Sequence, residues 1–102
     1  MQLAVTYRLA DRAEADLAAI WDYSAEQWST DQADRYVDEL IRRFAWLRRN
    51  RALWTSQPDL AEGLYSYPRR SHVIFFRLGG ELPDRIEIVR VLHRRMEPAK
   101  HI

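Results

Sequence analysis

Cysteine is absent from this chain of 102 residues, and glycine and proline are scarce, with three and four residues. Without cysteine there can be no disulfide framework, no thiol nucleophile and no thiolate metal site. The three histidines are not accompanied by carboxylates at the spacing of metal ligands. We therefore expect the protein to use neither a metal ion nor a cofactor.

Long apolar runs are also missing. The sequence contains no stretch of the length needed to cross a bilayer, and residues 1–5 lack the charged start and apolar middle of a signal peptide. We expect a cytoplasmic protein with no membrane partner. An apolar fraction of 47% over 102 residues suits one domain, spanning 1–102, with a core of its own.

What the chain does contain is arginine, and it is unevenly placed. The first 68 residues hold 8 arginines against 11 carboxylates, whereas residues 69–102 hold 8 cationic and 4 acidic side chains. The net charge of +1 thus conceals a basic C-terminal third. Arginine pairs with carboxylates and phosphates through two parallel hydrogen bonds, so this third is where a charged partner is expected.

The first half of the chain predicts a strand and two helices. Alternating apolar residues over 2–9 indicate a half-buried strand. An apolar stripe from Ala13 to Trp28 predicts a helix over about 12–28, with Asp11 and Glu14 as its capping box. A second helix should begin after a cap at 29–32 and run to about Arg49, where Asn50 could close it in the left-handed conformation.

The second half predicts a loop and three strands. Residues 51–63 have no sustained period, and we expect Leu53, Trp54 and Leu60 in this loop to pack against the helices. Strands are predicted over about 64–67, 70–78 and 85–92, with a turn at 79–84. The last strand is apolar on both faces, which indicates a central position in the sheet. The predicted fold is α+β, in the order β-α-α-β-β-β, with an antiparallel helical hairpin on a small, mainly antiparallel sheet.

Four tryptophans and five tyrosines are many for so small a core. Trp46 lies off the apolar stripe of the second helix, so it either faces a partner or is packed by neighbouring loops.

Several motifs, in this order of elements, resemble one family. The specific ones are the strand His72-Val73-Ile74-Phe75-Phe76-Arg77 and the closing segment Ile88-Val89-Arg90-Val91-Leu92-His93-Arg94-Arg95-Met96. Weaker ones are Tyr7-Arg8, Asp16-Leu17, Ile20-Trp21-Asp22-Tyr23, Ala33-Asp34-Arg35-Tyr36 and Gly63-Leu64. Together they cover nearly the whole chain and resemble the ParE branch of the RelE/ParE toxin family.

This resemblance implies a bacterial toxin of a type II toxin-antitoxin system. Such a toxin is neutralised by a ParD-like antitoxin, encoded beside it, that lays a helix and an extended segment across its surface. Members of the ParE branch act on DNA gyrase, and this chain alone is not expected to bind DNA sequence-specifically. The sequence departs from the family pattern in the scaffold, at 28–29 and 50–54, and at three further positions: Tyr65 replaces an arginine, Phe76 a tyrosine and Glu97 an aspartate.

On this basis we expect two sets of binding residues and no catalytic residue. The residues predicted to contact the target are Arg90, His93, Arg94 and Arg95. Those predicted to contact the antitoxin are Trp46, Arg69, Arg70, Arg90, Arg94 and Arg95.

Two alternatives remain open at this point. The RelE branch cuts messenger RNA on the ribosome, and this chemistry needs a proton acceptor, a proton donor and cations that hold the phosphate. His93, Arg90 and Arg70 are the nuclease candidates, with His72 and Glu62 as further residues of suitable type. The apolar Val73 stands where the nuclease branch has an arginine, which favours the gyrase inhibitor. The second alternative is a nontoxic family member that only binds antitoxin.

Overall fold

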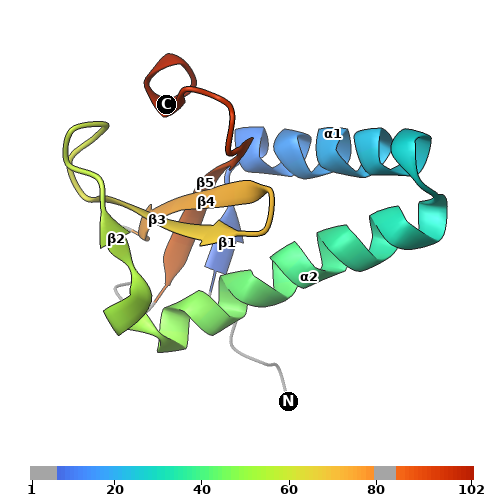
Figure 1. Cartoon of the computed structure of the whole chain (residues 1–102). Helices are drawn as coiled ribbons and strands as arrows, with labels where there is room; N and C mark the ends of the chain where they lie inside the picture. Colours follow the sequence, from blue (N-terminus) through green and yellow to red (C-terminus); the bar gives the residue numbers. More distant parts are fainter. Residues whose placement is uncertain (1–6, 80–84) are drawn as a thin grey trace.

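The structure is a computed structural model that describes residues 7–79 and 85–102. Two long helices lie beside a small twisted sheet (Figure 1). In chain order the elements are β1 (Tyr7–Leu9), α1 (Asp11–Gln27), α2 (Thr30–Arg49), the 3-10 helix η1 (Arg51–Leu53), β2 (Thr55–Ser56), β3 (Leu64–Arg69), β4 (His72–Leu78), β5 (Ile86–His93) and the 3-10 helix η2 (Pro98–Lys100). The rest of the predicted first strand and most of the predicted turn at 79–84 lie outside the described residues.

Helix α1 buries one stripe of side chains at steps of three and four residues: Ala13, Leu17, Ile20 and Ser24. Its predicted start is wrong by one position, because Ala10 is the N-cap and Asp11 already lies in the first turn. Asp11 and Glu14 there interact favourably with the positive end of the helix dipole. The predicted stripe also extends too far, because Trp28 is 67% exposed.

Helix α2 begins as the sequence predicts. The Ser29 hydroxyl accepts a hydrogen bond of 3.1 Å from the backbone N–H of Gln32, which satisfies one of the free donors at the helix start. The predicted left-handed closure at Asn50 is wrong, since its φ is −126°. Instead, the Asn50 side chain donates to the carbonyl of Trp46 at 2.7 Å and ends the helix in that way.

In the described part of the chain, five strands form one sheet in the order β1-β5-β4-β3-β2. β1 runs parallel to β5, and the other pairs are antiparallel. β5 is central, as its two apolar faces predict, while the two-residue strand β2 was not predicted. β4 starts at His72, later than predicted, because Arg70 and Ser71 form a tight turn in which Arg70 has a φ of +53°.

The main core lies between the helical hairpin and one face of the sheet. Its largest buried side chains include Leu40 and Phe44 of α2 and Ile74, Phe76 and Ile88 of the sheet. The other face carries a smaller cluster of three buried residues, Leu64, Phe75 and Leu92. The loop and the C-terminal segment partly cover this second cluster.

The expectation for the loop 51–63 is right for one of its three apolar residues. The indole N–H of Trp54 donates to the carbonyl of Leu47 at 2.8 Å, and its ring packs on Phe76. Leu53 is 51% exposed, contrary to the prediction. Leu60 packs in the smaller cluster, on the sheet face away from the helices.

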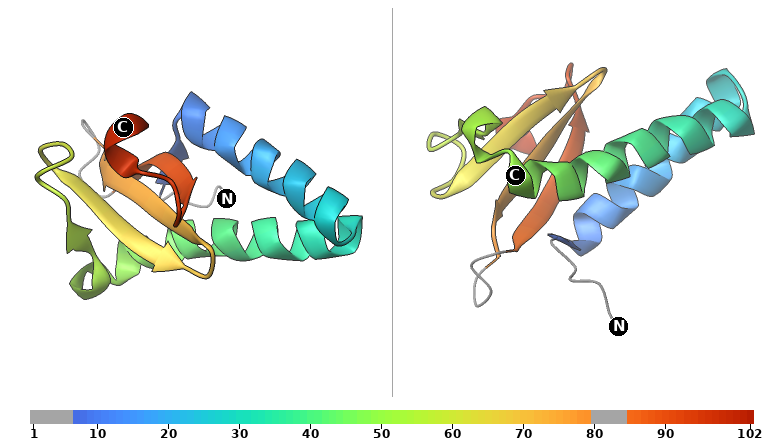
Figure 2. Two further views of the ribbon diagram at one scale, coloured as in Figure 1. Left: turned by 45° about the horizontal axis from the view of Figure 1, so that its top comes forward. Right: turned by 90° about the horizontal axis from the view of Figure 1, so that it is seen from below.

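The two helices run in opposite directions and meet at a junction that projects beyond the sheet, which Figure 2 shows from two further sides. A hydrogen bond of 2.8 Å from the Trp21 indole to Asp34 links them. The residues near this junction therefore have helix neighbours and no sheet beneath them, which explains the exposure of Trp28.

Candidate functional site

A groove of about 880 Å³ runs between the two helices and ends at the sheet. One wall is a stripe of α1 from Asp16 to Ser24 together with Trp28, which follows the helix, and the other is the face of α2 that carries Gln32, Tyr36 and Glu39. At the sheet end the lining comes from the β3–β4 turn, the end of β5 and the segment that follows it.

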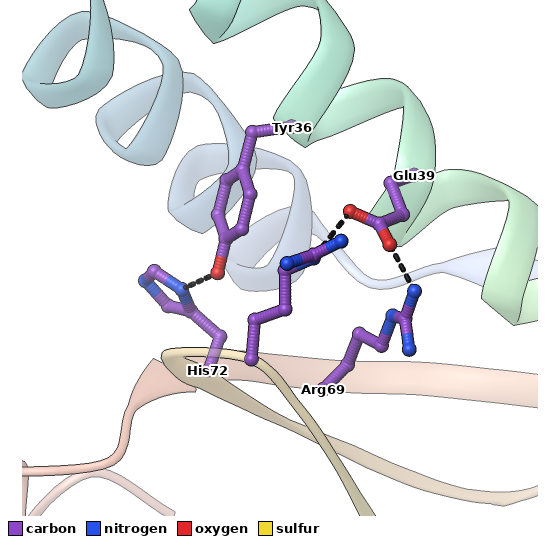
Figure 3. Close-up of polar contacts among 5 residues, drawn as sticks. Tyr36, Glu39, Arg69 and His72 are labelled. Atoms are coloured by element: carbon purple, nitrogen blue, oxygen red, sulfur yellow. Dashed lines mark hydrogen bonds and ion pairs between the residues drawn. The ribbon is translucent and has the colours of Figure 1, made fainter. Parts of the chain in front are cut away.

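The β3–β4 turn is attached to α2 at this end of the groove. Figure 3 shows Glu39 reaching Arg69 and Tyr36 reaching His72. Glu39 pairs with both Arg69 and Arg70, and its distance to the latter is 2.8 Å. Burial pushes the pKa of Glu39 upward, but the hydrogen bonds from the two arginines outweigh this effect and leave the pKa below its usual value.

Arg70 contacts Glu39 while its own backbone adopts a conformation that is unfavourable for arginine. A φ of +53° lies in the left-handed region, which costs a residue with a side chain more than it costs glycine. The Arg70 carbonyl also accepts a hydrogen bond from the guanidinium of Arg94. The turn is thus fixed from two sides, by α2 and by the segment after β5.

Two histidines face each other across β4 and β5. His72 and His93 are cross-strand partners, and their rings pack edge to face with centroids 5.2 Å apart. The Tyr36 hydroxyl lies 2.6 Å from Nδ1 of His72, and the backbone N–H of Arg95 donates to Nδ1 of His93. Burial, with a contribution from the charge of His93, lowers the pKa of His72 to about 4. His72 is consequently neutral at physiological pH.

Arg90 lies in the wall beside the groove and is 8% exposed. Its guanidinium donates two hydrogen bonds to Asp16, of 2.8 and 2.9 Å, and a third, of 2.7 Å, to the carbonyl of His101. Asp16 accepts a further bond from the N–H of Val91. The hydrogen bond to Asp16 raises the pKa of Arg90 above its usual value. This cation is therefore already paired inside the protein.

Of the residues predicted to bind a partner, some meet in the groove and others do not. Arg70, His93 and Arg95 line it, and Arg94 is exposed next to its sheet end. Trp46 lies elsewhere: it is half-buried, its ring is 5.3 Å from that of Tyr67, and Arg43 lies over it. Among the nuclease candidates, Glu62 lies in the exposed loop before β3 and does not line this groove.

Sequence reasoning missed the aromatic pair at the helix junction. Tyr23 and Trp28 are 59% and 67% exposed, and their rings meet edge to face with centroids 6.4 Å apart. Both line the groove. A sequence signal was available, because two aromatic residues close to a helix end lie beyond the reach of a sheet this small.

Within residues 7–79 and 85–102, no cluster of three or more His, Asp or Glu side chains is arranged to hold a metal ion. The helices in these ranges are also too short or too polar to cross a membrane.

Comparisons with known proteins agree with this fold. A chromosomal ParDE toxin-antitoxin system from P. aeruginosa contains a chain of the same fold, with a TM-score of 0.70 at 21% identity, covering 87% of this chain and 95% of that one. The toxin ParE1 of Caulobacter vibrioides is 36% identical over 96 residues, which are 94% of this chain and 96% of the relative. Toxin ParE1 of Mycobacterium tuberculosis is 32% identical over the same shares.

The fold and these relatives place the chain among the small toxins of type II toxin-antitoxin systems. The family model of the ParE toxin of the type II toxin-antitoxin system parDE matches residues 7–98. The chain therefore belongs to the ParE toxin family, and the expected family and fold are confirmed. It is the toxin component of a type II system, and such a toxin has a cognate antitoxin.

Proposed function

We propose that this toxin inhibits DNA gyrase in the cytoplasm by binding to it, without bond-making chemistry of its own. Membership of the ParE family supports the choice of target. The engagement of three arginines at or beside the sheet end of the groove supports the absence of chemistry. Arg90 is held by Asp16 and the C-terminal backbone, and Arg69 and Arg70 are held by Glu39. A nuclease would need such cations free to stabilise the charged phosphate of the transition state.

The cognate antitoxin, a ParD-like protein, covers the groove with a helix. The single observation that carries this part of the proposal is the groove itself, whose walls are two helix faces and whose sheet end is basic. There, Arg70 and Arg95 line the groove together with the carboxylates Asp16 and Glu39, and Arg69 and Arg90 pair with these carboxylates from beside it. An amphipathic helix with an acidic end matches both its shape and its charge.

An extended segment of the antitoxin continues along the sheet, where it meets Arg69 and Arg94. Strand addition is limited at the β3 edge, because β2 already pairs with Tyr65 and Ser66 and because Pro68 has no N–H to donate. We therefore propose that this segment is held by side chains more than by backbone pairing.

Gyrase contacts the end of β5 and the segment after it, through His93, Arg94 and Arg95. The latter two side chains are exposed at the sheet end of the molecule. Arg90 contributes indirectly, because its bond to the His101 carbonyl fixes the last residues of the chain in place. The antitoxin and gyrase thus compete for the same basic surface at the sheet end of the groove.

The choice of target is tested in cells that express the toxin. We expect growth arrest with intact transcripts, and a loss of toxicity when Arg94 and Arg95 are replaced by alanine in a folded variant. Cleaved transcripts that disappear on His93→Ala would establish the nuclease alternative instead. Normal growth with full antitoxin binding would identify a nontoxic family member.

The antitoxin interface is tested by calorimetry with the double variant Arg94→Glu and Arg95→Glu. We expect weaker binding of antitoxin, since the reversed charges repel an acidic segment. Arg12→Glu, an exposed change on α1 outside the groove, is the matched control and should leave affinity unchanged. Equal affinity of the double variant and the wild type would remove both arginines from the interface.

A further inference from the structure

The two ends of the groove differ in chemistry. The end at the helix junction presents the exposed rings of Tyr23 and Trp28. The end at the sheet presents Arg70 and Arg95, next to the carboxylates of Asp16 and Glu39. A ligand that fills the whole groove therefore meets two exposed aromatic rings at one end, Gln32 and Arg35 of α2 along one side, and a basic surface at the other end.

The distance between these ends follows from the helix that joins them. Asp16 lies at the sheet end, where it accepts the N–H of Val91, and Trp28 lies twelve residues further along at the end of α1. At a rise of about 1.5 Å per residue this separation is about 18 Å. This separation corresponds to about three turns of an antitoxin helix that lies along the groove.

The aromatic end is ready to receive a side chain before any partner binds. The Tyr23 and Trp28 rings already support each other at 86° in an edge-to-face contact. Because the helix junction projects beyond the sheet, both rings stay open to solvent. Preformed, exposed aromatic pairs are typical of residues that contribute strongly to binding, because little side-chain entropy remains to be lost.

We propose that the groove recognises the antitoxin helix by two anchors about three turns apart. A large apolar side chain sits against Tyr23 and Trp28, and an acidic pair about ten or eleven positions away on the same face meets Arg70 and Arg95. This inference rests on the proposed antitoxin interface and adds its register. The spacing between the two anchors then decides which antitoxin helices fit this toxin and which do not.

The test measures the affinity of purified antitoxin, encoded beside the toxin gene, for toxin variants across a range of salt concentrations. Trp28→Ala should weaken binding roughly tenfold to a hundredfold at every salt concentration, because an apolar anchor is lost. Arg95→Glu should weaken binding about tenfold at low salt and should reduce the salt dependence itself, because a charged contact is lost.

Two exposed positions outside the groove serve as matched controls. Leu53→Ala removes an apolar side chain that is 51% exposed, and Arg12→Glu reverses an exposed charge. The affinity of the antitoxin for both variants should stay within twofold of its affinity for the wild type. Tyr23→Ala gives a second test of the aromatic anchor, and circular dichroism confirms that each variant is folded.

Substitutions in the full-length antitoxin give an independent test of the spacing. Moving the large apolar residue by two positions, onto another face of its helix, should weaken binding as strongly as Trp28→Ala does in the toxin. Unchanged affinity of the moved variant would overturn the spacing.

The outcomes separate this inference from the function on which it rests. If the antitoxin binds the wild type but tolerates both Trp28→Ala and Tyr23→Ala within twofold, the two-anchor inference is overturned and the antitoxin interface stands. If the antitoxin does not bind the wild-type toxin at all, both are overturned.

Discussion

The ion pair of Asp16 and Arg90 gives the sharpest prediction about stability. Asp16→Asn keeps the size of the side chain but removes the charge opposite an arginine that is 8% exposed. In the wild type Asp16 accepts three hydrogen bonds, two from Arg90 and one from the N–H of Val91. The substitution leaves the Arg90 charge without a counter-ion in the wall of the protein.

The magnitude follows from this burial. Removing one partner of a buried ion pair costs about 3–5 kcal/mol. The side chains of Asp16 and Arg90 are 14% and 10% exposed, and some contact with water remains, so we expect a loss of about 3 kcal/mol. In a domain of this size such a loss lowers the melting temperature by roughly 12–24 °C.

Urea unfolding followed by circular dichroism measures this loss. The matched control is Asp38→Asn, because Asp38 pairs with Arg42 at the same distance of 2.8 Å but on the surface, where the side chains are 57% and 79% exposed. Asp38→Asn should lower the free energy of unfolding by less than about 0.5 kcal/mol. If Asp16→Asn costs no more than this control, the argument from burial is refuted. A double change to Asp16→Leu and Arg90→Met should recover much of the loss, because no charge then remains buried.

Three smaller predictions concern pH, the strained turn and the helix cap. The lowered pKa of His72 means that only the unfolded state gains this proton between pH 6.5 and about 4, so stability should fall by up to about 1.4 kcal/mol per pH unit as the pH drops through this window. His72→Gln should flatten that slope in denaturant titrations at pH 7 and pH 5, and equal slopes would contradict the assignment. Arg70→Gly and Arg70→Ala both lose the contact to Glu39, but glycine accepts the φ of +53°, so thermal unfolding should find the glycine variant more stable by about 1 kcal/mol. Ser29→Ala should cost about 1 kcal/mol because the N–H of Gln32 loses its acceptor, and a loss below about 0.3 kcal/mol in the same assay would argue against the cap.

Much of the fold is readable from local patterns. The two apolar faces of β5 predict its central place, and the Ser29 cap predicts where α2 begins. The predictions that were wrong concern local details, for which the same residues allow more than one structure. Asn50 ends its helix through its side chain and not through a left-handed backbone, and both solutions use the same residue type. The two-residue strand β2 is too short for alternation to reveal it.

The candidate site was less accessible to sequence reasoning. A basic tail predicts a binding surface, but it does not reveal that Arg90 pairs with a carboxylate 74 positions earlier in the chain. Periodicity also placed Trp28 on the apolar stripe of α1, although the helix junction extends beyond the sheet that would bury it. Only the arrangement of the helices in space distinguishes a core tryptophan from an exposed one.

The central claim is that this toxin binds and inhibits gyrase and that the antitoxin prevents it. The most direct measurement is gyrase supercoiling of a relaxed plasmid in vitro, first with purified toxin alone and then with an excess of antitoxin. Our account predicts inhibition or trapped linear plasmid that the antitoxin reverses. Unchanged supercoiling in the presence of folded toxin would contradict it.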